Sequence, residues 1–514
     1  MLKKLKQKLE CTANSNTFIK KVNAFLDSKW YLVAFACFVF LFQALGLDGF
    51  AFVIIAALFL YISLFKENTN ATVPIICFAT FCASTVNSPA QKASGFEIVG
   101  AGDFVVNAGS TYYSSPLFFV CFIIAVVLVV VGVLYRMFAY ADFRKTFAKK
   151  SLVWGVLALA VSYLLSGIGY SQYSVDDLVM SLVQAGTLIA IYVYLTSTVD
   201  FEKFNLDALA SLCVTIIFYI MALVCYIYAT RFYGFLEFTG EWKAYMLCGW
   251  GMSNDFGIFI AMMMPALFYK MYHSQKYSFV WYIFACLSVV ILFFTYARGA
   301  LLVGAPIFVI GTVVALIRKQ NRKTSIITVS CAVCVCAVAL VILYFTGAFD
   351  AIMEYHIGKV SNGTEFENVS SGRADIWKRY FEYFVSNPIF GGGFTVDKIF
   401  YIENGMEVAN GAFSAYSYFA HNTLFQLMGS CGIVGLFAYI YHTLTTIIIY
   451  FKKPNFKRFI FAFALFGFVA TAMLDVVFFK PYFTLIYAVI LTVCEADARK
   501  CALQSNDKKE NENV

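Results

Sequence analysis

Residues 371–380 read SGRADIWKRY and lie at the centre of a long polar stretch between Phe345 and His421. Apolar segments surround this stretch on both sides. Connections of such length are uncommon unless they carry function. The sequence therefore predicts a helical bundle whose chemistry lies in the loop of residues 346–421.

The composition indicates a polytopic membrane protein. Of the 514 residues, 61% are hydrophobic and 13% are charged, against roughly 45–50% and about 25% in soluble domains. The net charge of +8 comes mostly from short basic clusters between apolar runs, so it reports topology and predicts no nucleic-acid partner. The fifteen cysteines fall mainly in apolar runs, and no disulfide framework is expected.

A helix needs about 20 apolar residues to cross the hydrocarbon core. Runs of that kind predict an all-α fold with about fourteen transmembrane helices and a long extracytoplasmic loop that contains an amphipathic helix. The approximate limits of the runs are 30–46, 49–65, 72–86, 116–135, 151–166, 178–196, 208–228, 251–272, 279–295, 300–317, 326–345, 432–450, 459–474 and 482–494.

Basic residues in the short loops set the orientation. They gather before the first run and in the loops 136–150, 318–323 and 452–458, whereas the loop 87–115 has only Lys92. This asymmetry predicts three regions. They are a cytoplasmic N-terminal segment (1–29), a membrane domain (30–494) whose loop 346–421 is extracytoplasmic and catalytic, and a cytoplasmic tail (495–514).

A helix is expected inside this loop. Ser371 can cap it, and Asn387-Pro388 can end it. The side chains expected on one face, for contact with the membrane interface and with Trp377 as the anchor, are Ile376, Trp377, Tyr380, Phe381 and Phe384.

Cationic groups are the first candidates for chemistry on the outer face. Arg298 lies in a tight turn between two apolar runs, and Arg373, Lys378 and Arg379 crowd into seven positions. Converging guanidinium groups suit a phosphate dianion. Two plainer interpretations stay open: Arg298 can reach the lipid headgroups, and Asp375 or a loop glutamate can pair with Arg373.

Other candidates lie further along the loop. Gly391, Gly392 and Gly393 offer backbone donors, and His421 can take a proton from a hydroxyl near neutral pH. Tyr418 and Asn422 are polar neighbours of this histidine. No aspartate or glutamate occurs between Gly411 and Leu474 to act as another base nearby in sequence. No acidic pair suited to Mg²⁺ is evident in the loop, so we expect a reaction without metal or cofactor.

In order and spacing, these residues resemble the O-antigen ligase and Wzy polymerase superfamily of bacterial glycan assembly. The likeness spans roughly residues 287–441. It rests on an outside-turn arginine in TYARGA (295–300), Ser-Gly-Arg followed by Trp377, NPIFGGGF (387–394), HNTL (421–424) and GIVGL (432–436).

The resemblance implies a membrane glycosyltransferase of the GT-C type whose substrate is an oligosaccharide on undecaprenyl pyrophosphate. It further implies that Arg298 and Arg373 hold the pyrophosphate as it leaves, and that His421 orients or deprotonates the acceptor hydroxyl. The substrate-binding set expected around them is Lys378, Arg379, Gly391, Gly392, Gly393, Tyr418 and Asn422.

The acceptor distinguishes the alternatives. The number of spans favours an O-antigen or capsule repeat-unit polymerase over an O-antigen ligase or a protein O-oligosaccharyltransferase. A lipid-linked oligosaccharide flippase and a peptidoglycan polymerase of the shape-and-division family remain rivals from other classes. The expected setting is the bacterial inner membrane, with membrane lipids, an acceptor glycan or lipid, and a chain-length regulator or flippase as partners.

Overall fold

The computed structural model describes residues 2–45, 47–82, 116–148, 151–231, 253–274, 277–295, 297–318, 322–345, 373–394, 396, 419–451 and 455–512. Every regular element within these ranges is helical. The first half contains α1 (Leu2–Ser15), α2 (Thr17–Leu26), α3 (Lys29–Ala44), α4 (Asp48–Phe65), α5 (Thr72–Cys82), α8 (Pro116–Ala139), α9 (Phe143–Thr146), α10 (Val153–Leu164), α11 (Val175–Thr198) and α12 (Leu206–Arg231).

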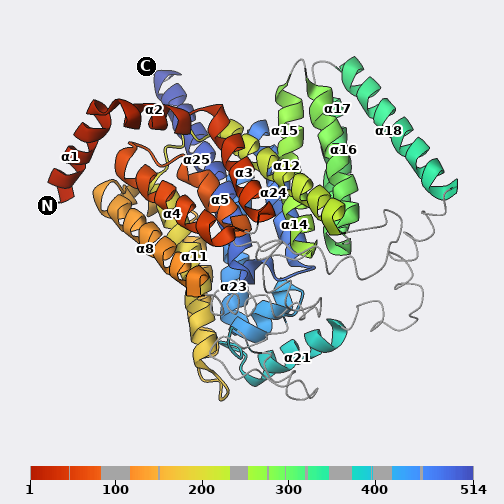
Figure 1. The fold of residues 1–514 in the computed structure, drawn as a ribbon. Coiled ribbons are helices and arrows are strands. Elements are labelled where there is room, and N and C mark those ends of the chain that lie inside the picture. Colours follow the sequence, from red (N-terminus) through yellow and green to blue (C-terminus); the bar gives the residue numbers. More distant parts are fainter. Residues whose placement is uncertain are drawn as a thin grey trace.

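The second half contains α14 (Ser253–Met263), α15 (Pro265–His273), α16 (Ser278–Phe294), α17 (Arg298–Arg318), α18 (Arg322–Phe345), α21 (Arg373–Ser386), α23 (Thr423–Phe451), α24 (Phe456–Ala472), the short 3₁₀ helix η1 (Val477–Phe479) and α25 (Pro481–Glu512). Figure 1 shows these helices side by side, with α1 and α18 at opposite edges of the bundle.

Several of these helices are long and apolar enough to cross a membrane, which agrees with a multi-pass membrane protein. Among the described residues, four qualify: Val120–Ala139, Asp177–Thr198, Leu206–Tyr226 and Thr423–Tyr450. The pair α2 and α3, bent by 83°, is a fifth candidate if it forms one broken span. Each of the fourteen expected runs overlaps a helix, but that number of crossings stays a prediction.

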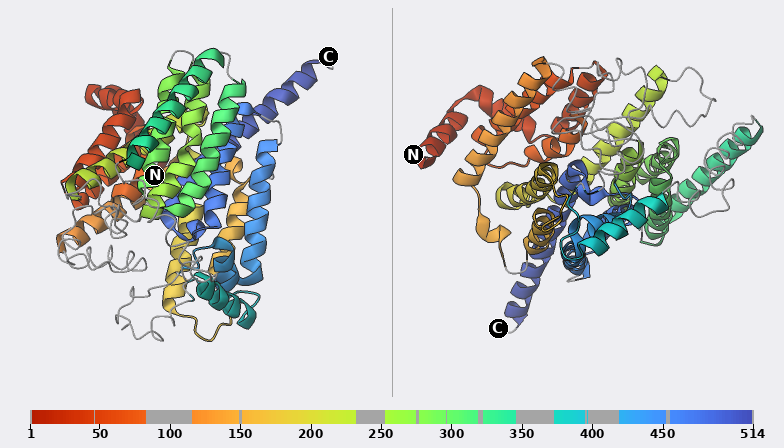
Figure 2. Two further views of the ribbon diagram at one scale, coloured as in Figure 1. Left: turned by 90° about the vertical axis from the view of Figure 1, so that its right-hand side faces the viewer. Right: turned by 90° about the horizontal axis from the view of Figure 1, so that it is seen from below.

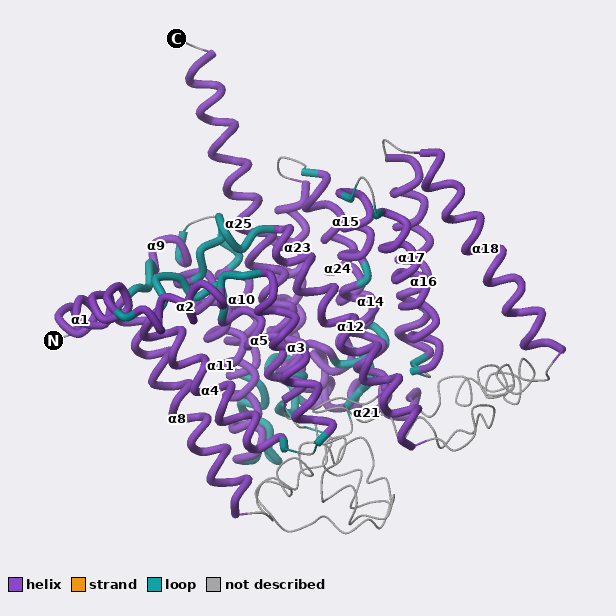
Figure 3. The backbone as a smooth tube through the Cα atoms, turned by 45° about the horizontal axis from the view of Figure 1, so that its top comes forward, coloured by secondary structure: helices purple, strands orange, loops and turns teal. Residues whose placement is uncertain are grey.

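The core is built around α25. Side chains from Phe483 to Cys494 are almost all buried, including Ala488, Ile490 and Leu491 at 0% exposure. Figure 2 shows this helix running from the middle of the bundle toward the C-terminus, and Figure 3 shows its last turns projecting beyond the other helices. A helix that is apolar all round needs such a central place.

At Gly432, the backbone of α23 contacts the backbone of the turn that follows α21. Gly432 interrupts α23 with φ 63° and ψ −154°. The carbonyls of Pro388 and Ile389 accept the N–H groups of Ile433 (2.9 Å) and Val434 (3.3 Å), which are released by that break. The turn after α21 thus caps the second half of α23.

The apolar residues of α21 differ in their surroundings. Trp377 stacks on Phe425 at a centroid distance of 5.2 Å, and its indole N–H donates to the Ala420 carbonyl at 2.7 Å. Trp377 is thus half-buried against the start of α23, and its role as an anchor in the membrane interface stays a prediction. The exposed apolar side chains here are Phe381 and Val385, one helical turn apart.

The break at Gly432 generates a stability prediction. A Cβ there would lie 2.5 Å from the carbonyl carbon and oxygen of Ile389, and the backbone conformation is one that side chains strongly disfavour. Gly432→Ala should destabilise the protein by about 2 kcal/mol or more, seen as a lower melting temperature in detergent. Gly186→Ala on α11, where a Cβ meets nothing within 4 Å, is the control. Equal melting of the two variants would contradict this account of the joint.

Candidate functional site

The loop between α24 and α25 gathers residues from three distant parts of the chain. Its Met473 carbonyl accepts from the Asn422 side-chain amide at 3.0 Å, and its Leu474 carbonyl accepts from Arg373 Nη1 at 3.2 Å. Gly299 approaches so closely that a Cβ there would lie 3.3 Å from Leu474 Cβ. The starts of α17, α21 and α23 therefore meet at this loop.

Asp475 is the buried acid at the centre of the loop. Its Oδ1 lies 3.7 Å from His421 Nδ1, an electrostatic contact longer than a hydrogen bond. Its Oδ2 lies 3.5 Å from Lys480 Nζ, and that ammonium also pairs with Asp255 Oδ1 at 2.9 Å. Asp255, Lys480 and Asp475 thus form a chain of alternating charges, called the charge chain below, that ends at His421.

Burial and pairing oppose each other in this chain. Burial alone would raise the pKa of Asp475, but Lys480 and His421 outweigh it, and the pKa lies well below its ordinary value. Burial would lower the pKa of Lys480, yet Asp255 and Asp475 hold it well above its ordinary value. Asp475 is thus an anion and Lys480 a cation at neutral pH.

The two candidate arginines face the same region. Burial lowers the pKa of Arg373, the charge of Asp475 opposes that shift, and the charge of Arg298 adds to it. The two guanidinium groups are therefore close enough to repel each other. A bound phosphate or pyrophosphate would relieve this repulsion by pairing with both.

Helix ends reinforce the positive potential. Arg298 and Arg373 are the first residues of α17 and α21, Thr423 starts α23, and α14 begins two residues before Asp255. The N-terminus of a helix carries partial positive charge and unpaired N–H groups. Four such ends near one loop favour an anionic ligand.

His421 has an unusual backbone. With φ 46°, it is the one residue other than glycine with positive φ in the described part of the chain. Side chains enter this left-handed region rarely, though histidine is enriched there. Its neighbour Asn422 caps α23 by accepting from Leu424 N at 2.9 Å, so the strained residue directly precedes a fixed helix start. The imidazole remains partly accessible, with 27% of the side chain exposed.

Other predicted site residues have different surroundings. The N–H groups of Gly391, Gly392 and Gly393 donate to the carbonyls of Asn387, Gly429 and Ser430. The first bond closes the turn, and the other two hold it against α23, so the donors expected for a ligand are occupied within the protein. Asn422 is likewise engaged on both sides of its amide.

The remaining predicted residues lie on α21 or outside the described ranges. Lys378 is exposed, and Arg379 is half-buried. Tyr418 lies outside the described residues. The sequence suggested Asp375 as a partner of Arg373, but Asp375 is exposed and the acid that acts on Arg373 is Asp475.

Sequence reasoning missed Asp475, Lys480 and Asp255. Asp475 lies one residue beyond the stretch from Gly411 to Leu474, which contains no aspartate or glutamate. A usable signal was present, because Asp475 and Lys480 are charged residues at the boundary between two apolar runs. Charges at such boundaries mark candidate sites in membrane proteins.

In a comparison with known protein families, residues 283–440 match the family model for O-antigen ligase. This segment is similar to an O-antigen ligase domain. The match confirms the resemblance to the O-antigen ligase and Wzy polymerase superfamily over residues 283–440. The match contains Arg298, Arg373 and His421, whereas Asp475 and Lys480 follow it. A search of curated proteins finds no match to the chain.

Lys480 generates a stability prediction for the site. Lys480→Met leaves Asp255 and Asp475, whose side chains are 3% and 6% exposed, without their shared cation. Removing one partner of a buried ion pair costs about 3–5 kcal/mol, so the melting temperature should fall sharply. Lys203→Met breaks an exposed pair with Asp200 at 3.6 Å and should cost less than about 1 kcal/mol. Wild-type melting of Lys480→Met would contradict the charge chain.

Proposed function

We propose that the protein transfers an oligosaccharide from undecaprenyl pyrophosphate to a hydroxyl of a glycan or lipid acceptor in cell-surface polysaccharide assembly. The observation that carries the proposal is the meeting of Arg298, Arg373 and His421 around Leu474 and Asp475, inside or next to an O-antigen ligase domain. These groups supply an anion clamp and a base in one place.

In the proposed reaction, the acceptor oxygen attacks the anomeric carbon of the donor sugar. The new carbon–oxygen bond forms as the bond to the pyrophosphate oxygen breaks, and polyprenyl pyrophosphate leaves as an anion. Arg298 and Arg373 stabilise the charge that develops on the leaving oxygen. Fixed guanidinium groups in a partly dehydrated site stabilise such charge more strongly than water does.

His421 takes the proton of the acceptor hydroxyl. Since Nδ1 faces Asp475, Nε2 is the nitrogen available to the acceptor. A carboxylate beside Nδ1 favours the tautomer with a proton on Nδ1 and stabilises the imidazolium that forms. The proposed step uses no metal ion, so we expect purified protein to turn over lipid-linked donor in excess chelator.

The acceptor separates the members of this superfamily. The sequence favours a polymerase only through the expected number of membrane spans, and that number stays a prediction. The glycan of a deletion strain distinguishes the candidates. Single repeat units on the cell surface indicate a polymerase, unattached long chains a ligase, and loss of glycoprotein glycan a protein transferase. A flippase would instead leave repeat units on the cytoplasmic side.

The arginines generate the first catalytic prediction. Arg298→Lys and Arg373→Lys keep a charge but lose the planar two-point contact with phosphate. Each should reduce turnover of purified protein on lipid-linked donor by about 100- to 1000-fold while the protein stays folded. Arg144→Lys, at an exposed position on α9, is the control. Unchanged turnover of either site variant would remove that arginine from the mechanism.

The second catalytic prediction concerns His421. His421→Ala should lower transfer by about 100- to 10,000-fold, while donor binding, supported by the arginines, largely persists. His421→Gln can orient a hydroxyl but cannot take its proton at neutral pH, so we expect the same loss. If the Gln variant turns over at the wild-type rate, His421 only positions the acceptor. Donor binding must be measured on the same samples.

A further inference from the structure

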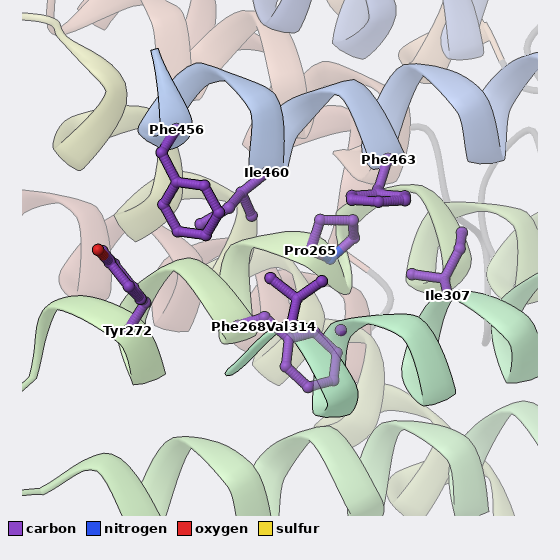
Figure 4. Close-up of a pocket in the computed structure, with 9 residues that line it drawn as sticks. Pro265, Phe268, Tyr272, Ile307, Val314, Phe456, Ile460 and Phe463 are labelled. Carbon is purple, nitrogen blue, oxygen red and sulfur yellow. The ribbon is translucent and has the colours of Figure 1, made fainter. Parts of the chain in front are cut away.

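Apolar packing between α15, α17 and α24 is nearly complete. Figure 4 shows Phe456, Ile460 and Phe463 of α24 facing side chains of α15 and α17. The cavity that remains between them is about 20 Å³, room for about one water molecule. Exposed apolar side chains that lie next to lysines occur instead on the N-terminal helix α2.

α2 lies at the end of the bundle opposite α21. Figures 1 and 2 show it at the same end as the C-terminus. Its axis is bent by 83° from that of α3, the helix that follows after Asp27 and Ser28. Since α3 is the apolar member of this pair, a course of α3 across the membrane puts α2 nearly parallel to the membrane surface.

One side of α2 is fixed to the end of α4. The Asn23 side-chain amide donates to the Phe65 carbonyl at 3.2 Å, and the Tyr61 hydroxyl donates to Asn23 Oδ1 at 3.3 Å. Lys66, the residue after α4, pairs with Asp27 at 2.8 Å. These contacts determine which side of α2 faces the bundle.

Charged groups mark the level at which α2 lies. Arg136, near the end of α8, donates to the carbonyls of Ile62 and Glu67 at 3.1 Å each, so it caps the same end of α4. The side chain of Lys66 is 3% exposed. Charged side chains are costly in hydrocarbon and gather at its boundary, and Trp30, exposed at the start of α3, is a residue type common at that boundary. The ends of α4 and α8 therefore place α2 at the level of the lipid headgroups.

Exposed side chains of two kinds occupy the rest of α2. Phe18 and Phe25 are 71% and 46% exposed, and because they are seven positions apart they share one side of the helix. Lys20 lies about 160° around the helix from Phe18, and Lys21 lies about 60° from it. Both lysines are exposed. A helix with aromatic residues on one side and lysines on the other is typical of the membrane interface.

The N-terminal segment is strongly basic. Its first 30 residues contain seven lysines and two acids. Of the acids, Asp27 is paired with Lys66, and Glu10 accepts from the Tyr140 hydroxyl at 3.1 Å. Such a surplus of positive charge near a membrane surface attracts anionic lipid headgroups.

We propose that α2 is an interfacial helix that binds anionic phospholipid at the end of the bundle opposite α21. Phe18 and Phe25 enter the upper part of the acyl region, and Lys20 and Lys21 pair with headgroup phosphates. The inference is independent of the proposed transferase activity, because it uses none of the candidate site residues.

Spin labels test the position of α2. Phe18→Cys and Lys20→Cys are each labelled in full-length protein whose exposed native cysteines are replaced by alanine. The protein is reconstituted into vesicles of phosphatidylcholine and phosphatidylglycerol, and power-saturation EPR gives the depth of each label. We expect the label at position 18 about 5–10 Å below the phosphates and the label at position 20 at or above them. Two labels in water, or two labels at the depth of the acyl chains, would overturn the proposal, since α2 would then lie off the membrane or form one broken span with α3.

The lipid preference is tested at the same helix. Phe25→Cys carries a bimane fluorophore, and phosphatidylcholine vesicles contain a small share of nitroxide-labelled phosphatidylglycerol or of phosphatidylcholine with the same nitroxide. Quenching should be stronger with the phosphatidylglycerol. Lys20→Gln/Lys21→Gln should reduce this preference by up to about fivefold for each lysine. Lys500→Gln, which removes an exposed charge on α25, is the control and should leave the preference unchanged.

The charge assignment has two outcomes that would overturn it. They are equal quenching by the two labelled lipids and a wild-type preference in folded Lys20→Gln/Lys21→Gln. Melting temperature in detergent checks the folding of each variant. Because both lysines are exposed, their replacement should change it little.

Discussion

The buried carboxylate of Asp475 is the group on which the arrangement of the candidate site depends. It faces Lys480 on one side and His421 on the other, and Lys480 continues to Asp255 on α14. A buried charge is costly unless it is paired. The pairing therefore constrains where α14, α23 and the start of α25 can lie relative to one another.

Backbone contacts of the same loop hold the arginines and the histidine. The Leu474 carbonyl fixes Arg373, and the Asp475 carbonyl accepts from Thr423 Oγ1 at 3.0 Å. Glycines allow this arrangement, since Gly299 meets Leu474 and Gly432 lets the turn after α21 cap α23. The result is a rigid frame around the groups to which we assign chemistry, as precise catalytic geometry requires.

Much of this could be predicted along the chain. Apolar runs predicted the helices, and the order of Arg298, Arg373 and His421 indicated a family resemblance that the match to residues 283–440 confirms. What was missed depends on tertiary contacts. The glycine amides are occupied by carbonyls of Asn387, Gly429 and Ser430, and Trp377 packs on Phe425. Asn387 lies in the same turn as Gly391, but Gly429, Ser430 and Phe425 lie on α23, so the contacts with them leave no local signal.

The acid was missed for a related reason. Asp475 is 54 positions from His421 in sequence but 3.7 Å away in space, so a search for a base near the histidine in sequence could not find it. The central claim is that Asp475 orients His421 for proton transfer. Asp475→Asn keeps the size of the side chain and the backbone contacts but removes the charge. Steady-state kinetics of the purified, folded variant on lipid-linked donor test the claim most directly. The account predicts a fall in kcat of about 100-fold or more with little change in KM for the donor, and a wild-type kcat would contradict it.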